Sequence, residues 1–265
     1  RYEMGRKAEW LYTRLPWDGK DHIQEMASGL KSEHFSTNQI AELVKAWLSG
    51  IFERGEGGRH NQMIILHGAQ GAGKDVWIEN LCKGFDPYFS NYTDTMQEKD
   101  IFTQIASNLI VNISEFDKLN KNHPGQVKDM ISRKTAQFRP AYARAISSFI
   151  MRASFIGSTN EMDFLTDATG NRRFWLIPIT GIDWSYPKDR AEQIVAQAQA
   201  LALEGCEISS TTARKMNDLI RGVTPVSSED VLLEMYQDIF DNEHFKFKEK
   251  VRFNEIHDQL DAARR

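Results

Sequence analysis

A glycine-rich stretch, GAQGAGKD, occupies residues 68–75 and contains residue types that bind phosphate. An apolar run at 62–67 precedes it, a helical pattern at 74–83 follows it, and the stretch fits G-x-x-x-x-G-K. Glycines let backbone N–H groups turn toward phosphates, and the lysine of such a loop reaches the β- and γ-phosphates. We therefore predict ATP binding by Gly68, Gly71, Gly73, Lys74 and Asp75. The alternative is a glycine-rich turn that carries a surface lysine.

The last residue of this stretch departs from the usual pattern. A serine or threonine normally follows the lysine and ligates Mg²⁺ through its hydroxyl, but here Asp75 stands there, followed by Val76. A carboxylate at this point repels the phosphates unless a cation lies between them. Asp75 therefore predicts either a direct Mg²⁺ ligand or impaired hydrolysis.

Acidic residues follow a second apolar run, at 109–113. Glu115 is the candidate that activates water, with Asp117 as a second possibility. Ser114 stands where a metal-holding acid is usual, which suggests that Asp75 and Ser114 have exchanged roles and leave the charge around Mg²⁺ unchanged. The predicted metal ligands are Asp75, Ser114 and Asp117. The alternative is that Ser114 and Asp117 are ordinary residues at a strand end and that the site is weak.

Alternating strands and helices are expected to position these residues. Apolar runs separated by helical patterns predict an α/β fold with a central, mainly parallel sheet, flanked by N-terminal and C-terminal helical regions. One helical stripe in the N-terminal region contains Ile40, Leu43, Val44, Trp47 and Leu48. Expected strands cover 62–67, 109–113, 153–159 and 173–179, and expected helices cover 74–83, about 96–107, about 123–132, 189–205 and 228–240. Expected domains are a helical region (1–57), an ATPase core (58–182), a second helical region (183–243) and the start of a small winged-helix-like domain (244–265).

The net charge of the chain limits how it could bind nucleic acid. There are 33 Lys and Arg against 37 Asp and Glu, a net charge of −4, so any such binding must be local. The two cysteines have no metal-ligand spacing, and no apolar run approaches the length of a membrane span. We expect a cytoplasmic piece of a longer protein that does not enter membranes.

A local basic and aromatic segment does occur, at 127–152. It carries basic residues against a single acid, and interleaved aromatic rings suit stacking on bases. The alternative is a solvated basic face with buried aromatic residues. The candidate contacts to DNA, expected to be single-stranded, are Arg133, Lys134, Phe138, Arg139, Tyr142 and Arg144.

Several stretches together resemble the virulence-associated E (VapE/VirE) family, which is related to primase-helicases of phages and mobile islands and to superfamily-3 helicases. They are LPWDGKD, ILHGAQGAGK, NISEFDKL, FRPAYAR, SFIGSTNEMDFLTDATGNRRFW and AQAQALALEGCE. The resemblance covers roughly residues 10–240. It implies a P-loop NTPase of the ASCE, AAA+-like type that hydrolyses ATP and assembles as a ring on DNA, with a hexamer expected.

The resemblance also implies roles for residues near the third and fourth expected strands. Asn160, at the end of its strand, is similar to the polar sensor that contacts the γ-phosphate or the attacking water. Arg172 or Arg173 is similar to the arginine that reaches the nucleotide of a neighbouring subunit. A hairpin before the sensor strand projects into the ring channel in these helicases, and the basic segment occupies that position.

Three functions remain open from the sequence. The leading one is an ATP-dependent DNA helicase or translocase in replication of a phage or mobile element, with a primase domain or partner upstream. The second is a nucleotide-binding scaffold or replication initiator with little turnover. The third is a P-loop small-molecule kinase, against which stand the GSTN strand end and the paired arginines.

Overall fold

The computed structural model describes residues 15–53, 62–92, 98–122, 129–139, 144–162, 173–187 and 189–223, with residues 10 and 13. The chain forms two compact units, residues 1–225 and 226–265. All described residues belong to the first unit. The helix expected at 228–240 and the small domain expected at 244–265 lie outside the described residues, and the boundaries of the four expected domains remain predictions.

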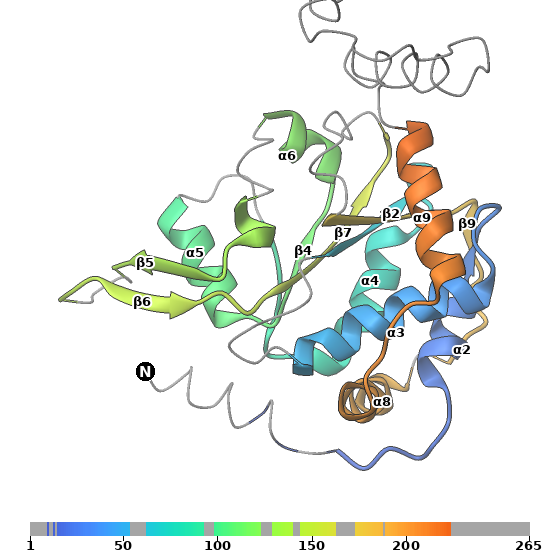
Figure 1. Ribbon diagram of the computed structural model, residues 1–265, viewed down its shortest axis with the longest axis horizontal. Helices are drawn as coiled ribbons and strands as arrows, with labels where there is room; N and C mark the ends of the chain where they lie inside the picture. The colour runs from blue at the N-terminus through green and yellow to red at the C-terminus, as the bar shows by residue number, and fades with distance from the viewer. Residues whose placement is uncertain are drawn as a thin grey trace, which may run out of the picture. The chain divides into compact units, whose positions relative to one another are not determined.

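A five-stranded parallel sheet forms the centre of the fold (Figure 1). Its order is β3-β4-β7-β2-β8, so the strand that leads into the glycine-rich loop lies between β7 and β8. The strands are β2 (Met63–His67), β3 (Phe89–Asn91), β4 (Ile110–Ile113), β7 (Ser154–Thr159) and β8 (Phe174–Pro178). The mainly parallel sheet predicted from the sequence is confirmed. β3 was not predicted, because it is short and two of its three residues are polar.

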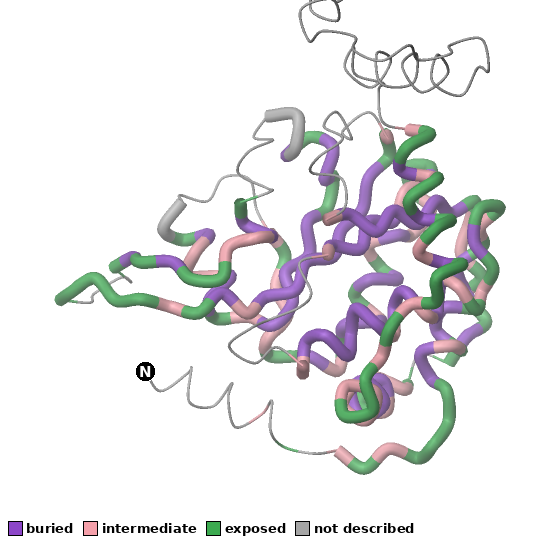
Figure 2. Tube along the Cα trace, viewed as in Figure 1, coloured by how far each residue is buried: buried purple, intermediate pink, exposed green. Residues whose placement is uncertain are grey.

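Nearly every residue of β2, β4, β7 and β8 is buried (Figure 2). Continuous burial of this kind is expected where a parallel sheet is covered on both faces. It explains why these strands appear in the sequence as apolar runs rather than as alternating patterns.

The helices that follow the strands agree with the sequence in part. α4 (Lys74–Cys82) and α5 (Glu98–Ser107) lie where they were predicted. α6 (Phe116–Asn122) was not predicted. Of the helix expected at about 123–132, residues 129–132 are helical and 123–128 lie outside the described residues.

A group of helices from the two ends of the unit packs together (Figure 1). α3 (Thr37–Glu53) packs against α2 (His22–Ser28) and against α8 (Ala191–Glu204), and α9 (Ser210–Val223) packs against β8. All five residues of the helical stripe predicted in α3 are at most 1% exposed. Two short strands, β1 (Leu30–Lys31) and β9 (Gly181–Ile182), pair in antiparallel fashion and join the two ends of the unit.

Glutamines of α8 hold the N-terminal segment 13–23 in place. An amide side chain offers both an acceptor and a donor, so each glutamine can form two hydrogen bonds to this segment. The Oε1 atoms accept hydrogen bonds from backbone N–H groups of this segment. Gln199 accepts from Leu15 at 3.0 Å, Gln193 from Asp18 at 3.0 Å and Gln197 from Ile23 at 2.9 Å. Their Nε2 groups donate to Thr13 O, Pro16 O and Asp21 Oδ1. This pairing places the LPWDGKD motif against α8.

An antiparallel hairpin precedes β7 and extends away from the sheet (Figure 1). Its strands are β5 (Thr135–Phe138) and β6 (Ser147–Ile150). The residues at its tip, 140–143, lie outside the described part of the chain. The hairpin falls where the resemblance implied one.

Candidate functional site

The glycine-rich loop connects the end of β2 to the start of α4. Gly71 and Gly73 have φ angles of +78° and +87°, a conformation that residues with a Cβ rarely adopt. The Gly68 N–H donates to the carbonyl of Thr159, at 3.3 Å, which ties the loop to the end of β7. The loop therefore lies at the carboxyl edge of the sheet, where ligands bind in open α/β folds.

Lys74 is enclosed by the loop and is only 6% exposed. Its Nζ donates to the carbonyls of Gly68 (2.7 Å) and Ala69 (2.9 Å) and to Asn160 Oδ1 (2.9 Å). Burial lowers the pKa of Lys74, and the nearby carboxylates of Asp75 and Asp117 act in the opposite direction. The structure thus brings together Lys74 and Asn160, two predicted site residues that are far apart in sequence.

Asp75 accepts two hydroxyl hydrogen bonds through a single oxygen. Ser114 Oγ donates to Asp75 Oδ1 at 3.0 Å, and Ser158 Oγ donates to the same atom at 2.8 Å. Asp75 and Ser114, the pair proposed to have exchanged roles, are therefore in direct contact. The sequence analysis missed Ser158. A signal for it was spacing, because Ser158 lies two residues before Asn160 at the end of β7, and residues two apart along a strand point to the same side.

Asp117 belongs to a different cluster. It is 5% exposed and accepts a hydrogen bond from Thr159 Oγ1 at 2.7 Å. Neighbouring residues of a strand point to opposite sides, so Thr159 and Ser158 face opposite sides of β7. Asp117 therefore contacts one side of the strand, through Thr159, and Asp75 contacts the other, through Ser158. Asp75 and Asp117 both act on the pKa of Lys74, and the metal-binding role predicted for Asp75, Ser114 and Asp117 remains a prediction. Among the described residues, no three His, Cys, Asp or Glu side chains gather in a way that would hold a metal ion.

Glu115 lies in the turn between β4 and α6 with a φ angle of +52°. Its carboxylate is exposed and pairs with Lys118 Nζ at 2.8 Å. Side-chain hydrogen bonding to Glu115 raises the pKa of Lys118. The structure thus places Glu115 directly after the strand that ends beside Asp75, and its catalytic role remains a prediction.

The two candidate arginines are only partly described. Arg173 is half-buried, and its Nε donates to Ser132 Oγ at 2.6 Å. Arg172 lies outside the described residues, as does Tyr142 of the basic segment.

The residues of the basic segment fall into two groups: some are buried or paired, and others are exposed to solvent. Phe138 is 8% exposed and stacks on Phe149, with ring centroids 4.4 Å apart. Arg133 pairs with Asp129, and its guanidinium lies 4.8 Å from the centre of the Phe102 ring. The prediction that Phe138 stacks on bases is therefore wrong for this conformation, because its ring fills the inner face of the hairpin.

The outer face of the hairpin is open to solvent. Strand register places Thr135 opposite Ile150 and Gln137 opposite Ser148, and all four are exposed. The basic side chains that remain exposed are Lys134, Arg139 and Arg144. Exposed Ile146, at 69%, lies beside them. Of the residues predicted to contact DNA, Lys134, Arg139 and Arg144 are thus exposed, on a surface that also contains exposed Ile150.

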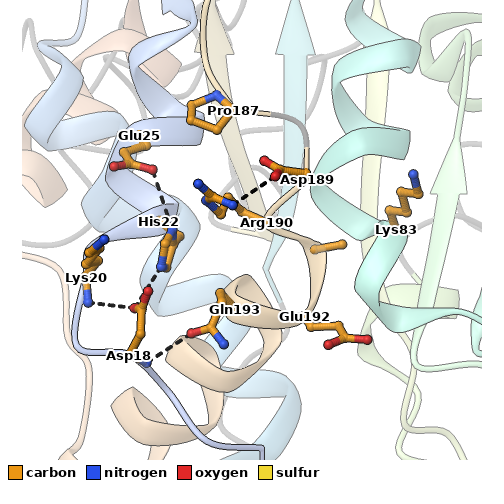
Figure 3. Close-up of a pocket in the computed structure, with 11 residues that line it drawn as sticks. Asp18, Lys20, His22, Glu25, Lys83, Pro187, Asp189, Arg190, Glu192 and Gln193 are labelled. Carbon is orange, nitrogen blue, oxygen red and sulfur yellow. Dashed lines mark hydrogen bonds and ion pairs between the residues drawn. The ribbon is translucent and has the colours of Figure 1, made fainter.

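A separate cavity of about 600 Å³ opens at the other end of α4, next to Lys83 (Figure 3). The segment 18–25 and the start of α8 complete its lining. His22 lies between Asp18 (2.8 Å) and Glu25 (3.5 Å), and Arg190 pairs with Asp189 at 2.9 Å. The lining carries both signs of charge, so it favours no ligand of one sign.

The fold is therefore a mixed α/β domain with a parallel sheet and a glycine-rich loop at its carboxyl edge. A family model for the virulence-associated protein E-like domain matches residues 12–221. This match covers most of the chain, so the protein belongs to the virulence-associated protein E-like family. No curated protein matches the sequence.

Solved structures with a similar fold include the C-terminal region (residues 305–718) of NrS-1 without ligand. One such structure has a TM-score of 0.56 and 16% identity and covers 89% of this chain. A second, the A form of the same region, has a TM-score of 0.52 and 18% identity and covers 84% of this chain. The chain spans 62% and 52% of the length of these two neighbours. At such identities the similarity shows the fold alone.

No helix in the described part of the chain is long and apolar enough to cross a membrane.

Proposed function

We propose that this protein is a P-loop nucleoside triphosphatase that binds ATP at the glycine-rich loop. The observation that carries the proposal is the convergence of Lys74, Asp75, Ser114 and Asn160 at one edge of the sheet. Lys74 would exchange its hydrogen bonds to the loop carbonyls for phosphate oxygens. Asn160, already in contact with Lys74, would then lie beside the terminal phosphate.

The side chains beside the loop also fit a magnesium ion. Mg²⁺ prefers oxygen ligands, and the Asp75 carboxylate together with the Ser114 and Ser158 hydroxyls offers three. When bound, Mg²⁺ neutralises phosphate charge and polarises the group that is transferred. Asp75 and Ser114 would hold the ion, and Ser158, which donates to the same Asp75 oxygen, would orient the carboxylate.

We further propose that ATP turnover drives unwinding of, or movement along, DNA in the replication of a phage or mobile element. Two features support this step: the resemblance of the sequence to ring-forming helicases and the exposed cations of the projecting hairpin. Single-stranded DNA would contact Lys134, Arg139 and Arg144, and a hexameric ring would bring Arg172 or Arg173 to a neighbouring ATP. The protein would act in the cytoplasm, with a primase domain or partner.

Steady-state ATP hydrolysis with Mg²⁺, measured with and without single-stranded DNA, tests the proposal. Wild-type protein should show turnover that DNA stimulates, and Lys74→Ala should reduce it by about 10²-fold or more. The matched control is Lys83→Ala, an exposed lysine at the far end of the same helix, which should leave turnover unchanged. Equal turnover in wild type and Lys74→Ala would refute the phosphate-loop assignment.

A second function, a nucleotide-binding scaffold with little turnover, is favoured by one observation. Glu115, the candidate that activates water, is exposed and paired with Lys118. The same assay separates the two functions. ATP binding without hydrolysis, unchanged by DNA, would favour the scaffold.

The proposed exchange between Asp75 and Ser114 has its own test. The single changes Asp75→Ser and Ser114→Asp should each reduce Mg²⁺-dependent turnover, because each alters the charge around the ion. The double change restores that charge and should recover most of the loss, which a double-mutant cycle measures. Purely additive losses would contradict the exchange.

A further inference from the structure

A short aromatic turn, residues 183–186, lies beside the glycine-rich loop and is held in a defined position. It directly follows β9, which is paired with β1. The Asp183 N–H donates to Gly29 O at 2.7 Å, and the Ser185 N–H donates to Asp183 Oδ1 at 3.0 Å. The turn is thus held by a main-chain hydrogen bond to Gly29 and by a hydrogen bond to the Asp183 side chain within the turn.

Tyr186 anchors the turn on its other side. It is 5% exposed, and a Cβ added to Gly29 would lie only 2.5 Å from its ring. The Trp184 ring lies 6.1 Å from the Tyr186 ring, at an interplanar angle of 38°. Trp184 is therefore presented on a rigid support, with little conformational freedom left to lose when a ligand binds.

Trp184 touches the loop itself. A Cβ built on Gly73 would lie 2.5 Å from Trp184 Cζ2 and 3.3 Å from Cη2, so the benzene edge of the indole rests against the Gly73 backbone. Trp47 and Trp77 are buried in the core at 1% and 0% exposure, whereas Trp184 is half-buried. Part of its surface therefore remains accessible beside the residue that precedes Lys74.

Val76 extends this apolar surface along α4. It lies three residues after Gly73, so both residues lie on the same side of the helix start. Its side chain is 52% exposed. The loop is thus bordered by exposed apolar surface next to the groups that suit phosphate.

We propose that Trp184 forms the stacking surface for the base of the nucleotide whose phosphates the loop holds. This inference rests on the proposed phosphate-loop function and adds what the loop cannot provide, namely selection of nucleotides over bare polyphosphate. Stacking on an aromatic ring contributes about 1–3 kcal/mol per base and tolerates different bases, because every base has a flat π face. The site should therefore accept ATP and GTP with similar affinity.

The test compares ATP with inorganic tripolyphosphate, which has the phosphates and lacks the base. Affinities for both ligands are measured by calorimetry for wild type, Trp184→Leu and Trp184→Phe. Trp184→Leu should weaken ATP binding about tenfold and leave tripolyphosphate binding unchanged, because only the base loses its contact. Trp184→Phe keeps a ring and should retain most of the ATP affinity.

Trp17→Leu is the matched control. Trp17 is also half-buried, and its Nε1–H donates to Lys20 O at 2.8 Å in the N-terminal segment that α8 holds. Its loss should change neither affinity. Thermal unfolding of each variant establishes that it is folded at the temperature of the measurement.

The outcomes separate the two proposals. If wild type binds neither ligand, the phosphate-loop function fails and the stacking proposal fails with it. If wild type binds both ligands and Trp184→Leu weakens both equally or neither, the stacking proposal alone is overturned. A tenfold loss for ATP only, recovered in Trp184→Phe, supports it.

Discussion

The loop edge of the sheet and the β5–β6 hairpin are built in opposite ways. At the loop edge, side chains from α4, β4 and β7 satisfy one another: Lys74 with Asn160, and Asp75 with Ser114 and Ser158. In the hairpin, the rings of Phe138 and Phe149 form a local apolar layer, and the polar groups face solvent. The first region depends on long-range polar pairs, and the second depends on local aromatic packing.

This difference shows what each region can do without rearrangement. The loop edge already holds its charged groups in defined positions, as a site for chemistry requires. The hairpin offers cations on an exposed surface that reaches away from the sheet, which suits a flexible polyanion. The basic segment of the sequence is therefore not uniformly available, because Arg133 is paired with Asp129 and Phe138 is buried against Phe149.

The largest expected effect comes from removing the aromatic layer of the hairpin. Phe138→Ala should lower the free energy of unfolding by about 3 kcal/mol, because it deletes a buried ring and leaves a cavity. Gln137→Ala, on the outer face, should change it by about 0.5 kcal/mol or less. Chemical denaturation measures both. Similar values for the two variants would mean that the hairpin is not held by its aromatic layer.

A smaller effect is expected from a buried polar pair at the loop edge. Thr159→Val keeps the shape but removes the hydroxyl that donates to Asp117 Oδ1, leaving a buried carboxylate without that partner. The free energy of unfolding should fall by about 2 kcal/mol, and Thr159→Ser should recover most of it. Equal stability of the Val and Ser variants in denaturation would show that the pair contributes little.

The smallest effect, on DNA affinity rather than on stability, is expected when exposed arginines of the hairpin are removed. Arg139→Ala combined with Arg144→Ala should weaken single-stranded DNA binding and reduce the slope of log affinity against log salt by about 1.4, if each contacts one phosphate. Binding of ATP without DNA should not change. Titrations at several salt concentrations measure the slope. An unchanged slope would exclude both arginines from the DNA contact, and Arg133→Ala is the comparison for a cation already paired with Asp129.

The strand and helix elements next to the loop were predictable because their signals are local. The apolar runs of β2, β4, β7 and β8 are long enough to be recognised, and glycine spacing marks the loop. β3 and α6 were missed because a three-residue strand and a seven-residue helix carry little periodic signal. β5 and β6 were suggested only by the resemblance, since each strand has four residues and β6 does not alternate between buried and exposed residues.

The site itself was predictable residue by residue but not as a set of contacts. The sequence assigned Asp75 and Ser114 to one site from their chemistry, and the structure shows a hydrogen bond between them. Asp117 was assigned to the same site, and the structure shows that it accepts a hydrogen bond from Thr159.

The sequence by itself determined the parallel sheet, the position of the glycine-rich loop and the candidate residues at the strand ends, because these follow from local periodicity and spacing. Only the tertiary structure decided which of them meet: Ser158 with Asp75, Thr159 with Asp117, Trp184 with Gly73. Strand order and the β1–β9 pairing set these contacts. They join residues distant along the chain, where spacing in the sequence carries no information about distance in space.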